Sequence, residues 1–196
     1  MKRRYADLFC GLGAFHTAFG KLDKDYECVF ACDIDEKVRH IYEMNHGIAP
    51  HGDINALDIE AMPDFDILCA GFPCQPFSIS GKKRGFEDTR GTLFFDVCRI
   101  IDEKKPKVVV LENVKHFLHH DKKRTISTVL NSLQDLGYNI SYKILNTKDF
   151  GLPQNRERIF IVGSLSGSFD FDQMKNTKSN PLAHFLDKSG DFEYLK

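Results

Sequence analysis

The stretch YADLFCGLG, residues 5–13, decides the fold, because an apolar run of strand length passes directly into a glycine turn. A second apolar run, residues 28–32, ends at Asp33, 20 residues after Gly13. A glycine turn after a first strand and a carboxylate after a second are typical of sheets that bind nucleotide-like ligands. The third glycine of the dinucleotide fingerprint is missing, so this pattern alone is a weak signal, and the turn could equally be only structural.

Further apolar runs continue the pattern along the chain, with helix-like segments between the earlier ones. Their alternation predicts a doubly wound α/β fold, a mostly parallel sheet covered by helices. The last two runs are joined only by residues 149–155, and so short a link favours an antiparallel pair at that edge. Gly137 is placed to end the last helix. The predicted strands are 5–10, 28–32, 66–70, 107–111, 139–145 and 158–164, and the predicted helices are 14–21, 36–45, 92–104 and 124–136.

Composition is that of a single globular domain of 196 residues, 42% of them hydrophobic. We expect one domain over residues 1–165 and a polar tail over 166–196. No apolar run reaches the ~20 residues of a membrane helix and no signal peptide is visible, which predicts a cytoplasmic protein. The six cysteines lack Cys-x-x-Cys spacing, which argues against a metal site and against disulfides. The net charge of −1 does not indicate a protein that grips phosphate backbones by itself.

The run GFPCQPFS at residues 71–78 places Cys74 between Pro73 and Pro76, directly after the apolar run 66–70. Proline fixes its own φ angle and restricts the residue before it, so this loop can hold a thiol in one orientation. Covalent catalysis requires such a positioned nucleophile. A lone cysteine in an intracellular chain is more often a buried apolar residue, so the assignment depends on its neighbours.

Those neighbours are FCGLG at residues 9–13, LENV at 111–114 and QNRER at 154–158. With these blocks in this order, the chain resembles the cytosine-C5 DNA methyltransferases of bacterial restriction-modification systems, from Tyr5 to about Gly163. The resemblance implies a Rossmann-like methyltransferase fold and transfer of a methyl group from S-adenosyl-L-methionine to C5 of a cytosine flipped out of duplex DNA. The cofactor product would be S-adenosyl-L-homocysteine, and the protein would be DNA-associated in a bacterial cytoplasm.

The resemblance assigns a role to particular residues. Cys74 would attack C6 of the ring, while Glu112, as a protonated carboxyl, would face N3. Arg158 would lie near the cytosine O2 and the Cys74 loop, and Arg156, two positions earlier, would project from the same face of its strand. A solvent-facing basic pair is the plainer alternative. The residues expected at the cofactor are Phe9, Gly11, Leu12, Gly13, Asp33, Ile34, Asp53, Ile54, Pro73 and Thr92.

Two of these cofactor assignments carry a reservation. Asp53 is also suited to cap a helix at Asn55, and Ile34 stands where the family often has a larger aromatic residue. The long stretch between Phe72 and Gly91 reads as an active-site lid that closes over DNA. The residues expected to contact the substrate are Pro73, Gln75, Ser78, Ser80, Arg84, Asn113 and Gln154.

Relatives in this family normally continue into a target-recognition domain and a returning C-terminal segment. Neither follows here, so we expect one part of a split or truncated enzyme, completed by another polypeptide, with apolar surface left exposed. Two alternatives stay open: a tRNA cytosine-5 methyltransferase with the same catalytic core, and a non-catalytic subunit that binds S-adenosylmethionine.

Overall fold

The computed structural model describes residues 2–22, 25–73, 93–178 and 181–185. The predictions for Cys74, Gln75, Ser78, Ser80, Arg84 and Thr92 therefore lie outside the described residues. No helix in the described ranges has both the length and the apolar character needed to cross a membrane.

Six strands form one sheet in the order β2-β1-β3-β4-β6-β5. The first four strands in this order run parallel to one another, whereas β6 runs antiparallel to both β4 and β5. This arrangement confirms the mostly parallel sheet with an antiparallel pair at one edge. The strands are β1 Arg3–Leu8, β2 Tyr26–Cys32, β3 Ile67–Ala70, β4 Val108–Val114, β5 Asn139–Asn146 and β6 Glu157–Ser164.

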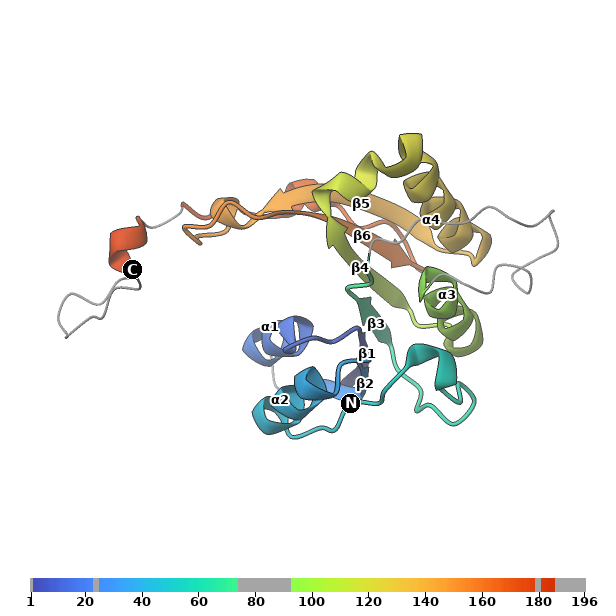
Figure 1. The fold of residues 1–196 in the computed structure, drawn as a ribbon. Helices are drawn as coiled ribbons and strands as arrows, with labels where there is room; N and C mark the ends of the chain where they lie inside the picture. Colours follow the sequence, from blue (N-terminus) through green and yellow to red (C-terminus); the bar gives the residue numbers. More distant parts are fainter. Residues whose placement is uncertain (1, 23–24, 74–92, 179–180, 186–196) are drawn as a thin grey trace.

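Helices cover both faces of the sheet. Helices α1 and α2 lie on one side of it and α3 and α4 on the other, so the sheet forms the middle layer (Figure 1). Most buried apolar side chains belong to one core cluster that includes Leu68, Phe94 and Ile161. The helices are α1 Ala14–Leu22, α2 Glu36–His46, α3 Leu93–Lys104 and α4 Arg124–Asp135, with short 3₁₀ segments that include Ile54–Ala56 and Lys115–Leu118.

Local chemistry sets where two of these helices end. Asp35 caps the start of α2, where its side chain accepts hydrogen bonds from the N–H groups of Lys37 and Val38, and Gly47, with φ of 72°, follows the last residue of the helix. Beyond α4, Gly137 has φ of 92° and its N–H donates to the Gln134 carbonyl at 2.8 Å. A left-handed backbone conformation at this position favours glycine. The helix end predicted at Gly137 is therefore confirmed.

Strand β4 extends further at its carboxyl end than the sequence predicted. Strand β4 does not stop at Leu111 but continues through Glu112 and Asn113 to Val114, because β6 pairs with it over its whole length. The register sets Glu112 opposite Phe160 and Val114 opposite Arg158. Residues directly opposite each other share a face, so Glu112 and Arg158 are diagonal neighbours on one face of the sheet.

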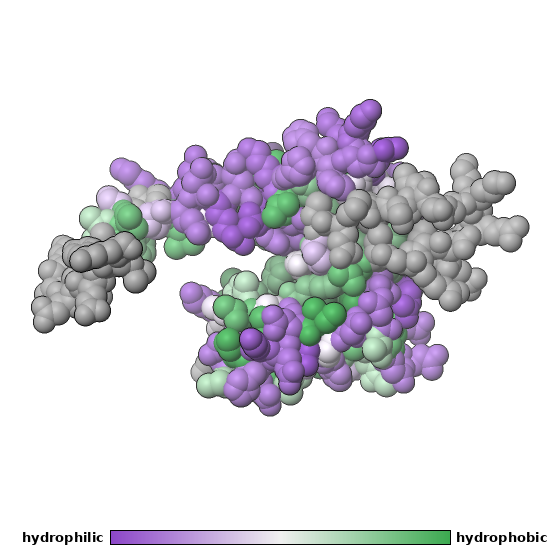
Figure 2. Space-filling view, in the orientation of Figure 1, coloured by the Kyte–Doolittle hydropathy of each residue, from purple (hydrophilic) through white to green (hydrophobic). Residues whose placement is uncertain are grey.

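The layer formed by α1 and α2 presents apolar side chains to solvent. Leu22 is 70% exposed, Met44 73% and Ile41 43%, and Leu12 in the turn before α1 is 61% exposed. In the space-filling view, apolar residues gather over this part of the molecule and in the hollow between it and the overlying strands (Figure 2). The exposed apolar surface expected from the sequence is therefore present.

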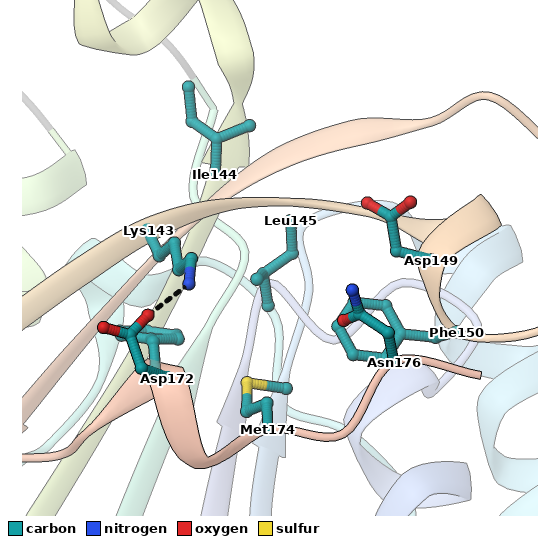
Figure 3. Close-up of a pocket in the computed structure, with 9 residues that line it drawn as sticks. Lys143, Ile144, Leu145, Asp149, Phe150, Asp172, Met174 and Asn176 are labelled. Carbon is teal, nitrogen blue, oxygen red and sulfur yellow. Dashed lines mark hydrogen bonds and ion pairs between the residues drawn. The ribbon is translucent and has the colours of Figure 1, made fainter.

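After β6 the chain turns back along β5. Phe171 is buried there, and Lys143 forms an ion pair with Asp172 at 2.7 Å. Phe150 and Thr177 form an isolated parallel bridge. Together with β5, this segment lines an open pocket of about 390 Å³ (Figure 3), so the first part of the predicted polar tail packs against the sheet. The pocket is lined by Lys143, Ile144, Leu145, Asp149, Phe150, Phe171, Asp172, Met174 and Asn176.

Candidate active site

The glycine turn leaves β1 in left-handed backbone conformations. Phe9 has φ of 54°, Gly11 of 53° and Gly13 of 85°. Such φ values favour glycine, because other L-residues meet a steric penalty there. The turn is closed by the N–H of Gly13, which donates to the Cys10 carbonyl at 2.9 Å. The turn then opens directly into α1.

Asp33, at the end of β2, ties this turn to the neighbouring loop. Its Oδ2 accepts the N–H of Gly11 at 2.9 Å, and its Oδ1 accepts the N–H of Asp35 at 3.0 Å. Each carboxylate oxygen has a second lone pair, so Asp33 can still accept hydrogen bonds from a ligand. The carboxylate predicted to meet a ligand therefore also holds the binding loop in shape.

A cavity of about 290 Å³ opens beside these loops at the carboxyl ends of the strands. Ligands bind at this edge in open α/β sheets. Asp53 lies on its wall and also caps the short helix that follows it, with Oδ1 2.9 Å from the N–H of Asn55, so both functions expected of it are compatible. The lining residues are Phe9, Cys32, Asp33, Ile34, Gly52, Asp53, Ile54, Gly71, Pro73 and Leu93.

Six of the predicted cofactor residues thus share one wall: Phe9, Asp33, Ile34, Asp53, Ile54 and Pro73. Gly11, Leu12 and Gly13 are not among the lining residues. Gly11 reaches the site through its bond to Asp33, whereas Leu12 and Gly13 shape the turn. The side chain of Ile34 is 74% exposed, so it offers an open apolar surface.

An ion pair joins two of the three predicted catalytic side chains that the structure describes, those of Glu112 and Arg158. Nε of Arg158 lies 2.8 Å from Oε1 of Glu112, and both side chains are about one-quarter exposed. The other carboxylate oxygen of Glu112 is directed toward Gly71, since a Cβ atom built there would lie 3.6 Å from Oε2. Glu112 therefore stands between Arg158 and the chain that leads to Cys74.

Asn113 fixes the base of that same loop. Its side chain is buried, and its Nδ2 donates to the carbonyl of Phe72 at 2.8 Å. The amide oxygen accepts the N–H of Val114 at 2.9 Å. Because Phe72 is two residues before Cys74, Asn113 links the strand that carries Glu112 to the loop that carries the predicted nucleophile.

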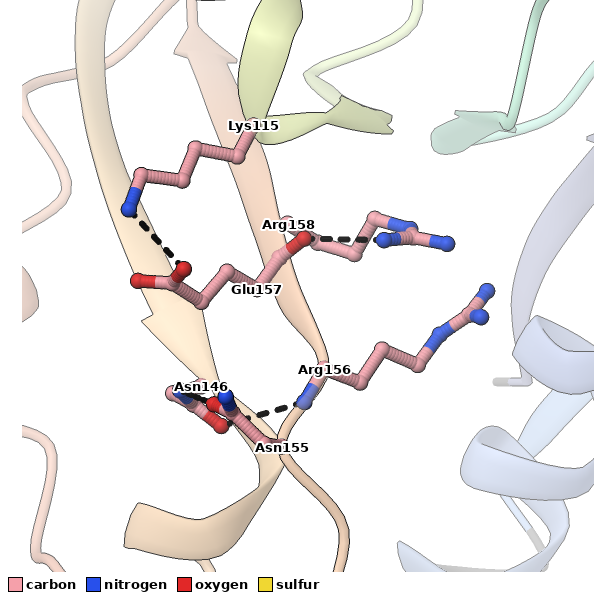
Figure 4. Close-up of polar contacts among 6 residues, drawn as sticks. All are labelled: Lys115, Asn146, Asn155, Arg156, Glu157 and Arg158. Atoms are coloured by element: carbon pink, nitrogen blue, oxygen red, sulfur yellow. Dashed lines mark hydrogen bonds and ion pairs between the residues drawn. The ribbon is translucent and has the colours of Figure 1, made fainter.

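Arg156 and Arg158 extend from the same side of their segment, as their alternate positions predicted, while Glu157 turns the other way and pairs with Lys115 (Figure 4). The backbone of Arg156 is held by Asn146, whose Oδ1 accepts the Arg156 N–H at 3.2 Å and whose Nδ2 donates to Asn155 at 2.7 Å. Sequence reasoning missed Asn146, which is buried at the end of β5.

Gln154 was expected at the substrate. Its backbone carbonyl accepts a hydrogen bond from the Thr147 hydroxyl at 2.6 Å, and Gln154 as a whole is exposed to solvent. The described contact therefore concerns the backbone of Gln154, which helps to close the link between β5 and β6. Any contact between its side chain and a substrate stays a prediction.

The five described cysteines are free thiols, and four of them are buried. Burial is the main cause that raises the pKa of each, to about 12 for Cys32 and above the ordinary range for Cys10, Cys69 and Cys98. The pKa of half-buried Cys28 is also raised by burial. Only a thiolate is a good nucleophile, so burial makes these five thiols poorly suited to covalent catalysis, and the role of Cys74 stays a prediction.

Asp7 is a second residue that sequence reasoning passed over. It lies fully buried in β1, and burial raises its pKa to about 7, against hydrogen bonds from the Tyr42 hydroxyl and the His16 N–H that lower it. Its Oδ1 has no hydrogen-bond partner among the described residues. An aspartate inside the apolar run YADL was the signal that could have identified it.

A doubly wound sheet with a glycine turn at its carboxyl edge, held by a carboxylate from the next strand, places this chain in the Rossmann-like fold class. Solved structures share this fold. One is the crystal structure of the Dnmt2 methyltransferase of S. pombe, with a TM-score of 0.75 and 24% identity over 97% of this chain and 62% of that one. Another is a prophage-encoded putative DNA modification methyltransferase from E. coli, with a TM-score of 0.72 and 21% identity over 92% and 52%.

Sequence comparison then gives the family. Residues 3–191 match the family described as C-5 cytosine-specific DNA methylase, and the chain belongs to that family. It is 52% identical to the type II methyltransferase M.HhaI of Haemophilus parahaemolyticus over 81% of this chain and 48% of that protein. It is 50% identical to M.NgoBI of Neisseria gonorrhoeae over 95% and 58%. The chain thus spans about half the length of the curated relatives it matches.

Proposed function

We propose that this chain is the cofactor-binding and catalytic part of a DNA (cytosine-5) methyltransferase that uses S-adenosyl-L-methionine. The observation that carries the proposal is the 2.8 Å pair between Arg158 and Glu112, set against the loop that leads to Cys74. When bound, S-adenosylmethionine supplies an electrophilic methyl group. The donor set of the adjacent cavity fits it, since Asp33 and Asp53 can accept hydrogen bonds from hydroxyl and amino groups and Ile34 offers an apolar contact.

The chain's own residues perform the remaining chemistry. The sulfur of Cys74 forms a bond to C6 of cytosine, the 5,6 double bond opens, and its electron pair makes C5 nucleophilic. The protonated Glu112 carboxyl donates its proton to N3 and so balances the charge pushed into the ring, and Arg158 pairs with the carboxylate that results and orients it. After methylation, a water molecule takes the proton on C5, and the electron pair of that C–H bond re-forms the 5,6 double bond while the bond between C6 and sulfur breaks. Cys74 leaves as a thiolate, and the proton at N3 returns to Glu112, which restores the aromatic ring.

The substrate we propose is a cytosine flipped out of duplex DNA, because C5 and C6 are stacked inside a duplex and inaccessible to a thiolate. The family description and the names of the relatives support DNA over the alternative, tRNA. We also propose that a further segment or polypeptide completes the enzyme. The exposed apolar side chains of α1 and α2 support this second point, since uncovered apolar patches mark interaction surfaces.

A trapping experiment tests the chemistry. The chain is co-expressed with the remaining half of a matching relative and incubated with S-adenosylmethionine and a duplex that carries 5-fluorocytosine, because fluorine at C5 cannot leave as a proton does. We expect a covalent protein–DNA adduct that resists denaturation. Cys74→Ser should abolish it, whereas the matched control Cys28→Ser, at a half-buried cysteine, should retain it.

Each alternative predicts a different outcome when the same proteins are also given tRNA and tested for binding of S-adenosylmethionine. Methyl transfer to tRNA without adduct formation on duplex DNA would favour the RNA methyltransferase. Binding of S-adenosylmethionine without an adduct on either nucleic acid would favour a non-catalytic subunit. An adduct that persists in Cys74→Ser would show that the nucleophile is wrongly assigned.

A further inference from the structure

The ring of His46 lies directly beneath the glycine turn. His46 is in the last turn of α2, and its Nε2 is 3.1 Å from the carbonyl oxygen of Leu12. A Cβ atom built on Gly13 would lie 2.1 Å from this Nε2 and 2.7 Å from Cδ2 of the same ring. The imidazole therefore fills the space that any side chain at position 13 would need. Gly13 is thus required both by its φ of 85° and by the ring below it.

The ring is itself held in place from two sides. It stacks on His16 of α1 with ring centroids 4.2 Å apart, and it packs against Tyr42 at 4.7 Å. His16 Nδ1 lies 2.9 Å from the Tyr42 hydroxyl, which donates to the buried carboxyl of Asp7 at 3.4 Å. These contacts link α1, α2 and β1, so the orientation of His46 is set by the packing of three elements.

The hydrogen bond to Leu12 also determines which ring nitrogen of His46 carries a hydrogen. A carbonyl oxygen only accepts, so Nε2 of His46 must carry the hydrogen. That bond and the closely packed ring restrain Leu12 and Gly13 together. The turn they form is the one that Asp33 braces from the other side, through the N–H of Gly11.

We propose that His46 is a positioning residue for the cofactor. It does not line the cavity but holds the glycine turn, from beneath, in the shape that binds the cofactor. This inference rests on the proposed function for the identity of the cofactor. Asp33 and His46 then act as two braces of one loop, the first at the cavity wall and the second behind the turn. Loss of the second brace frees Leu12 and Gly13 to leave the shape that S-adenosylmethionine requires, so the ligand must order the loop as it binds.

Cofactor affinity, measured by isothermal titration calorimetry with S-adenosylmethionine, tests the proposal. His46→Phe keeps a flat ring beneath Gly13 but removes the hydrogen bond, and we expect binding about fivefold weaker. His46→Ala removes both, and we expect a loss of more than about tenfold. His40→Ala, at an exposed histidine on the same helix, is the matched control and should bind as the parent protein does.

A double-mutant cycle separates positioning from general destabilisation. Gly13→Ala alone should weaken binding strongly, because its Cβ collides with the ring. Combining it with His46→Ala removes the collision, so the double variant should bind better than the product of the two single losses predicts. Additive losses that track the melting temperatures of the variants would overturn the proposal.

Hydrogen exchange gives a readout that does not depend on the cofactor. The Gly13 amide, which donates to the Cys10 carbonyl, should exchange faster in His46→Ala than in His40→Ala, with core amides unchanged. Equal exchange at Gly13 in the two variants would overturn the role of His46 even if the cofactor binds. If the Gly13 amide exchanges faster in His46→Ala but the parent chain does not bind S-adenosylmethionine, the proposed function is contradicted, whereas the role of His46 in holding the turn is supported.

Discussion

Replacing Asp7 by asparagine should make the chain more stable at pH 8 and remove the pH dependence of stability that we expect of the parent protein. Asp7 is fully buried, and its Oδ1 has no hydrogen-bond partner among the described residues. Such a site costs a charged carboxylate more free energy than it costs a neutral carboxylic acid or amide. Asparagine has the shape of the protonated acid and can still accept from Tyr42. At pH 5 the two proteins should therefore differ by no more than about 1 kcal/mol.

The sign follows from the raised pKa. Burial moves the pKa of Asp7 from 3.8 to about 7, so between these values the folded state keeps a proton that the unfolded chain has lost. The free energy of unfolding must then fall as pH rises from about 4 to about 7. One pKa unit corresponds to about 1.4 kcal/mol. The free energy of unfolding should therefore fall by about 4 kcal/mol over the whole pH range, and by about 3 kcal/mol over the part above pH 5.

Urea denaturation at several pH values between 5 and 8 measures this difference. The stability of the parent protein relative to Asp7→Asn should decline by about 3 kcal/mol across the range. Asp135→Asn, at an exposed aspartate near the end of α4, is the control and should run parallel to the parent. Titration of His16, whose pKa is lowered by burial and by His46, is common to all three proteins. If the parent and Asp7→Asn curves also run parallel, Asp7 is not a strained buried acid.

Two further predictions concern stability. Asn146→Ala removes the acceptor of the Arg156 and Lys148 N–H groups and should lower the free energy of unfolding by about 2 kcal/mol in urea titrations, whereas Asn139→Ala, on the same strand with one exposed contact, should change it by less than about 0.5 kcal/mol. Gly137→Ala should destabilise by about 1 kcal/mol because φ there is 92°, while Gly20→Ala inside α1, where a Cβ meets open space, should stabilise slightly. Equal effects within either pair of variants would refute the reasoning.

Much of this protein was predictable from the sequence because the signals are local. Strand-length apolar runs, helical periodicity and Gly137 predicted every element of the described sheet and each of the four long helices to within a few residues. The glycine turn and Asp33 predicted a ligand-binding edge, and six of the predicted cofactor residues line one cavity there. These features depend on backbone preferences and on the alternation of strands and helices, which short segments encode.

Other features were decided only by tertiary structure. The position of β6 between β4 and β5 brings Arg158 to Glu112, 46 positions earlier in the chain, and no local pattern specifies that register. The packing of α2 against the turn before α1 places His46 under Gly13, and burial is the main cause that raises the pKa of Asp7. Local sequence therefore specified the elements and the chemical groups, whereas distances and desolvation, which depend on how distant segments pack, decided which groups meet and in what electrostatic state.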